Sequence, residues 1–167
     1  KFTVDKVETK EVDSVSGDIE IKTAVVHYKE WLTPGREKAT KLVLYKDGNK
    51  KAVETFNELG EKTRLEFFDG ENSYQILLPD GIAIKLDNPL SLLNMYYFKD
   101  ELEKKYFVKK DKFLGRECNV YDLDNSLYYF WNGIMLKREF NSSIMGITSK
   151  LTTEADNIEI NVPISQD

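Results

Sequence analysis

The sequence has little of what conventional catalytic and metal sites are built from. It contains one cysteine, Cys118, and one histidine, His27, among 167 residues. A single cysteine excludes an internal disulfide, and a single histidine excludes a His-rich metal site. We also find no phosphate-binding loop, nucleophile elbow or zinc-ligand spacing. The sequence therefore predicts a protein that is not an enzyme and that needs no cofactor and no metal.

Long apolar runs are also missing. The longest strictly apolar run covers residues 127–131, whereas a membrane-spanning helix needs about 20 residues. No segment has the apolar core of a signal peptide. Because the first residue is lysine rather than methionine, we expect that an upstream signal or lipid anchor has been removed. Contact with a membrane surface is then expected only through this lost N-terminal anchor.

Charge of one sign does not dominate. Charged residues make up 32 % of the chain and the net charge is −5. No basic stripe is present to neutralise phosphates, which argues against nucleic acid as a partner. The chain has 167 residues, of which 41 % are apolar. This length and composition are sufficient to bury the core of one domain. We predict a single domain over residues 1–167, in which residues 1–15 form a weakly ordered lead-in or an edge strand.

Turn signals are frequent and regular. Asp-Gly pairs stand at residues 47–48, 69–70 and 80–81, and an Asn-Gly pair at 132–133. These pairs favour type I′ hairpin turns because both central residues tolerate positive φ. Between them, apolar and polar residues alternate, which is typical of strands. The pattern predicts about ten strands, in residues 17–31, 38–46, 51–59, 63–68, 73–78, 81–87, 117–123, 126–131, 134–140, 147–154 and 158–164.

One segment departs from this alternation. Asn88 and Pro89 are a helix-start signal, and Leu90, Leu93 and Tyr97 follow at helical spacing. We predict one amphipathic helix at about residues 89–105. Consecutive antiparallel strands form a meander, and so wide a sheet curls rather than staying flat. The predicted fold is therefore mainly β (α+β): a curved antiparallel meander that forms a half-open barrel, with the helix on its concave side.

Two motifs are better explained by structure than by chemistry. Cys118 lies in a strand pattern, and nothing links it to His27 as a base, so we interpret it as a buried core thiol. Residues 122–126 resemble the start of a calcium loop but lack its later Gly and Glu. We interpret this segment as a hairpin turn.

Aromatic residues are the one group of candidate functional residues that remains. The chain has nine Phe, nine Tyr and two Trp, and each ring can bury roughly 150–250 Å². A curled sheet whose interior one helix does not fill would leave them lining an apolar cavity. Plain core packing is the alternative for each single residue. The predicted ligand-binding residues are Trp31, Phe67, Tyr74, Ile76, Leu93, Tyr97, Tyr129 and Trp131.

Two segments resemble a known superfamily. Residues 64–81, RLEFFDGENSYQILLPDG, are similar to the central hairpins of the bacterial lipoprotein-carrier superfamily (LolA/LolB-like). Residues 31–36, WLTPGR, are similar to its strand–Pro-Gly–basic corner, and residues 115–121 with 129–139 resemble strands of outer-membrane lipoprotein-sorting relatives. The resemblance spans most of residues 17–164. Residues 1–15 do not resemble the N-terminal helix of the carriers.

The resemblance implies a half-open barrel that holds lipid acyl chains in the bacterial cell envelope. We therefore expect non-enzymatic binding or carriage of an acyl chain or other apolar ligand, in a periplasmic or outer-membrane-associated protein. A lipoprotein or another envelope protein is a further expected partner. The alternative is an envelope sensor or protein-interaction domain with a filled core and no small-molecule ligand.

Overall fold

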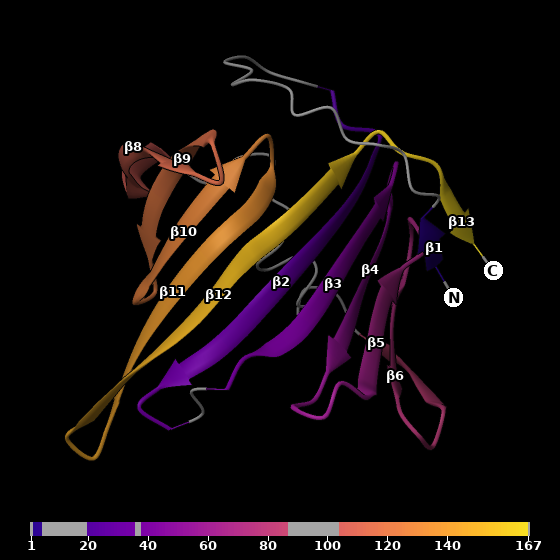
Figure 1. Cartoon of the computed structure of the whole chain (residues 1–167), viewed down its shortest axis with the longest axis horizontal. Helices are drawn as coiled ribbons and strands as arrows, with labels where there is room; N and C mark the ends of the chain where they lie inside the picture. Colours follow the sequence, from indigo (N-terminus) through magenta and orange to yellow (C-terminus); the bar gives the residue numbers. More distant parts are fainter. Residues whose placement is uncertain (1, 5–19, 36–37, 87–103, 167) are drawn as a thin grey trace.

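The computed structural model describes residues 2–4, 20–35, 38–86 and 104–166. These residues form an open sheet of 11 antiparallel strands, drawn in Figure 1. The sheet is strongly twisted, and β8 and β9 bend over at one end of it. This confirms the predicted mainly-β class and the antiparallel sheet, which is open and not closed; the predicted half-open barrel is shown only as far as this open sheet.

The strands fall into two runs along the chain. The first run is β2 (Thr23–Thr33), β3 (Thr40–Asp47), β4 (Lys50–Phe56), β5 (Lys62–Phe68), β6 (Ser73–Leu77) and β7 (Ile82–Leu86). The second run is β8 (Phe107–Phe113), β9 (Arg116–Leu123), β10 (Ser126–Trp131), β11 (Ile134–Ile144) and β12 (Ile147–Ile160). Separately, β1 (Phe2–Val4) pairs with β13 (Ile164–Gln166).

The strand order corrects the prediction of one continuous meander. Each run is a meander, but the two are joined by pairing of β12 with β2, giving the order β7-β6-β5-β4-β3-β2-β12-β11-β10-β9-β8. Strands β12 and β2 are among the longest, with 14 and 11 residues. Their pairing therefore forms the middle of the sheet. The edge strands β7 and β8 come from the middle of the chain and do not pair with each other, which leaves the sheet open.

The predicted helix is not confirmed. Residues 89–103 of it lie outside the described residues, and residues 104–106 form a 3₁₀ turn, η2 (Lys104–Tyr106). Strand β8 follows at once, although the sequence pattern did not predict a strand there. Its residues are mostly exposed, so no buried alternation marks it. Three lysines on this edge strand discourage pairing with other chains.

The hairpin positions were predicted correctly, but the turn type at the Asp-Gly pairs was wrong. At these pairs only the glycine has positive φ, and in the β3–β4 hairpin Asp47 pairs with Lys50, so that Gly48 and Asn49 form the turn. Asp69 instead accepts hydrogen bonds from the backbone N–H groups of Glu71 and Asn72. Both central residues have positive φ in the turns at 114–115, 124–125, 132–133 and 145–146.

The last long strand was predicted as two. Residues 147–154 and 158–160 belong to the single strand β12, whose register against β2 shifts between Ala155 and Asn157. This bulge inserts one residue and interrupts the alternation. The interruption is what the sequence pattern showed as a gap between strands.

Strand pairing divides the sheet into two faces. On one face, Ala24, Val26 and Tyr28 of β2 pack in the main core with Leu44 of β3. The Tyr28 hydroxyl donates a hydrogen bond of 2.6 Å to the Met135 carbonyl oxygen, which satisfies both groups inside the core. The opposite face carries the alternate residues of β2, including Val25, Lys29 and Trp31. We call it the Trp31 face.

Candidate ligand-binding face

The predicted ligand-binding residues that the structure describes all belong to the Trp31 face. Trp31 pairs with Thr152 of β12, which pairs with Glu139 of β11, which pairs with Leu127 of β10. Alternation along β10 and the pairing from β2 through β6 place the remaining residues on the same face: Tyr129 and Trp131 on β10, Phe67 on β5, and Tyr74 and Ile76 on β6. Leu93 and Tyr97 lie outside the described residues.

At one side of this face, β5 and β6 carry an apolar group. Phe67 and Tyr74 are cross-strand partners whose rings stack with centroids 5.0 Å apart and an interplanar angle of 24°. Leu65 and Ile76 form the next pair on the same face. All four side chains are only partly buried. We call these four residues the β5–β6 apolar group; it presents apolar surface that the sheet itself does not cover.

At the other side, Tyr129 and Trp131 are buried, because at β9 and β10 the cluster that forms the main core also includes residues of the Trp31 face. The Tyr129 ring lies 6.4 Å from that of Phe113, and the Lys137 Nζ lies 5.3 Å from the Tyr129 ring centroid. The Arg116 guanidinium lies 5.0 Å from the Trp131 ring centroid. Protein groups already pack against both rings. Contact of a ligand with Tyr129 and Trp131 therefore stays a prediction.

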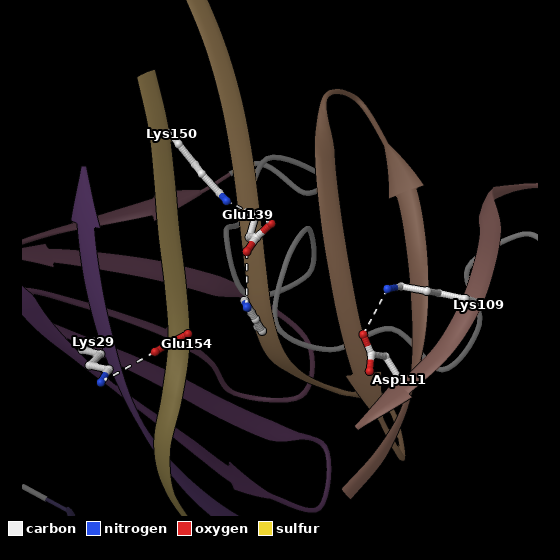
Figure 2. A network of polar contacts seen from close by, with 7 residues as sticks. Lys29, Lys109, Asp111, Glu139, Lys150 and Glu154 are labelled. Atoms are coloured by element: carbon white, nitrogen blue, oxygen red, sulfur yellow. Dashed lines mark ion pairs between the residues drawn. The ribbon is translucent and has the colours of Figure 1, made fainter. Parts of the chain in front are cut away.

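A polar strip on β2, β12 and β11 separates the two aromatic ends of the face (Figure 2). Lys29 pairs with Glu154 at 3.6 Å, and Glu139 pairs with Lys137 at 3.2 Å and with Lys150 at 3.3 Å. Trp31 borders this strip, with the Lys29 Nζ 5.8 Å from its ring. The predicted set is therefore brought to one face, but not into one continuous apolar patch.

Glu139 is held in its charged form within this strip. Burial by itself raises the pKa of its carboxyl group, but hydrogen bonds and attraction from Lys137 and Lys150 outweigh burial and lower the pKa overall. The native state therefore favours the carboxylate. Its contribution to stability is present above the unfolded-state pKa of glutamate and is lost as the pH falls through the lowered native value.

A buried ionic group lies beside the β5–β6 apolar group and was not anticipated from the sequence. The buried Glu54 carboxylate forms an ion pair with Lys62 and accepts a hydrogen bond from the Tyr45 hydroxyl. Burial, followed by the nearby carboxylate, raises the pKa of Tyr45, so that its hydroxyl remains a donor. Strand alternation by itself does not distinguish a buried acidic residue such as Glu54 from a solvated one.

The predicted burial of Cys118 is confirmed: its side chain is fully enclosed in the main core. Burial raises the pKa of this thiol to about 11. The native thiol is therefore expected to react at least about 100-fold more slowly with Ellman's reagent at mildly alkaline pH than the thiol in urea. Stopped-flow absorbance checks this, and equal rates in the two states would contradict it.

The described part of the chain gathers no group of metal ligands. No three His, Cys, Asp or Glu residues there come close enough to hold a metal ion. His27 is half-buried in β2, opposite Asn157. Residues 124–125 form the β9–β10 turn, as predicted for the segment that resembles a calcium loop. Over the same described residues, no helix is long and apolar enough to cross a membrane.

The comparisons with known proteins include a distant likeness of shape. No family model matches the chain, and no curated protein matches it. A solved structure to which the chain is similar is that of a LolA superfamily protein from Nitrosomonas europaea. That likeness has a TM-score of 0.38 and 11 % identity, and covers 83 % of this chain and 85 % of that chain. At this level the likeness carries nothing further about the function of this chain.

Proposed function

We propose that this protein binds an acyl chain or another apolar molecule on its Trp31 face, as a non-enzymatic carrier or receptor of the bacterial envelope. The supporting observation is the β5–β6 apolar group, a stacked Phe67–Tyr74 pair that stays partly exposed on an open sheet. The resemblance of residues 64–81 to lipoprotein-carrier hairpins covers this same pair of strands. A lipid or another apolar small molecule is the expected ligand, and a lipoprotein or other envelope protein is a further candidate partner.

Burial of apolar area is sufficient to drive such binding. Each Å² of apolar surface removed from water contributes roughly 25 cal/mol, so a long acyl chain needs no specific polar anchor. The Glu54–Lys62 pair lies beside the apolar group, since Glu54 is the cross-strand partner of Leu65. The polar strip begins farther along the sheet, at β2, beyond β4 and β3. The ligand tail is expected to lie on the β5–β6 side of the face.

A second candidate function is a sensor or protein-interaction domain with a filled core. The burial of Tyr129 and Trp131 favours it, because these rings are already packed against protein groups. The two functions differ in whether the isolated chain takes up a small apolar molecule.

A titration with a fluorescent fatty acid distinguishes the two. The delipidated protein is expected to bind the probe saturably, and unlabelled palmitate is expected to displace it. Binding driven by apolar burial also depends only weakly on salt. A probe signal no greater than that of a non-binding control protein would overturn the proposed function and favour the interaction domain.

A further inference from the structure

The β11–β12 hairpin extends beyond both of its neighbours in the sheet. β10 begins at Ser126, opposite Phe140, and β2 ends at Thr33, opposite Lys150. Residues 141–149 therefore form a two-stranded ribbon with no strand on either side, and Figure 1 shows it projecting from the sheet. A ribbon of two strands contributes little stability by itself in water, so its length is not explained by the fold.

The end of this ribbon is apolar and exposed. Ile144 and Ile147 face each other across it and are 69 % and 65 % exposed, while Met145 in the turn is 98 % exposed. Met145 has a φ of 53°, a conformation that Asn or Gly adopts at lower cost. The turn geometry thus disfavours methionine here, which points to a role for the side chain outside the fold.

The ribbon also lacks the charge found elsewhere in the chain. Between Glu139 and Glu154 the only charged residue is Lys150, whereas charged residues make up 32 % of the whole sequence. The strand residues behind the tip, at positions 142, 143, 148 and 149, are serines and one threonine, and their backbones pair across the ribbon. The absence of acidic side chains suits entry into a lipid interface, where water and headgroups still hydrate the backbone groups along the outer edges of the ribbon.

We propose that this tip, residues Ile144, Met145 and Ile147, inserts into the interfacial region of a lipid bilayer. Three apolar side chains on a turn are too few for a stable protein interface, which buries about 800 Å² on each partner. They suit shallow insertion, where buried apolar area sets the strength of binding. This membrane contact is separate from the proposed ligand face and from any N-terminal anchor.

Site-specific labelling tests insertion directly. Cys118 is fully buried, so the variant Met145→Cys accepts an environment-sensitive fluorophore at the tip alone. The control is Asn49→Cys, in the exposed β3–β4 turn at the opposite end of the strands. With phosphatidylcholine vesicles, the label at position 145 is expected to brighten and shift to the blue, and the label at 49 to stay unchanged. A label at 145 that does not respond overturns the proposal.

Vesicle flotation gives the second measurement. The combined variant Ile144→Ser, Met145→Ser and Ile147→Ser is expected to lose more than about tenfold in vesicle affinity, since buried aliphatic carbons drive insertion. An unchanged affinity overturns the proposal. A dimer of the native chain would also overturn the proposal if sedimentation velocity showed that it forms with rising concentration and is abolished in this variant. The tip would then contact a second copy of the chain and not a bilayer. Fatty-acid binding in the variant is expected to be unaffected, which separates this test from that of the ligand face.

Discussion

The substitution Phe67→Asp is expected to weaken binding of a fluorescent fatty acid by more than about tenfold. Phe67 stacks on Tyr74 and is only partly buried on the proposed ligand face. A carboxylate there would have to leave water when an acyl chain covers it, which opposes binding. The measurement is the dissociation constant from fluorescence titration of the delipidated variant.

Phe68 provides the matched control. It is the next residue on the same strand, is also partly buried, and packs on the opposite face against the main core. Phe68→Asp is expected to lower stability while the folded fraction keeps its affinity for the probe. If the two variants lost affinity equally, the ligand would not be specific to the Trp31 face, and our assignment of that face would be wrong.

The substitution Lys62→Met is expected to lower the free energy of unfolding by about 2 kcal/mol. Lys62 is 34 % exposed, but its partner Glu54 is only 6 % exposed, so removing the lysine leaves a buried carboxylate that has lost its paired charge and keeps the Tyr45 hydroxyl as a donor. The cost is smaller than for a fully enclosed pair because water already reaches the lysine. Urea unfolding at neutral pH measures it.

The double variant Glu54→Leu with Lys62→Met is the control for this prediction. Removing both charges avoids the unpaired carboxylate, so most of the lost stability should return. A double variant less stable than Lys62→Met alone would show that the pair stabilises the sheet beyond compensating its own desolvation. That result would contradict our interpretation of the ionic group.

Short-range features of the fold could be predicted from the sequence. Clean alternation located β6, β9 and β10 to within about one residue, and Asn132-Gly133 gave the correct two-residue turn. These features depend on neighbouring residues only. The turn type at the Asp-Gly pairs was wrong because Asp69, for example, bonds to nearby backbone groups instead of adopting positive φ.

Long-range features could not be predicted in the same way. The pairing of β12 with β2 depends on contacts between opposite ends of the chain, which no local pattern encodes. Strand β8 was missed because an exposed edge strand has no buried alternation. Alternation did bring the described candidate residues to one face, but the intervening polar strip follows from the β2–β12–β11 register and required the structure.

Native mass spectrometry of the freshly purified chain tests the central claim, that this open sheet shelters an apolar ligand, most directly. We predict an added mass equal to that of a lipid or fatty acid, which organic extraction removes and incubation with fatty acid restores. A chain that carries no added mass as purified, and gains none on incubation, would contradict the account.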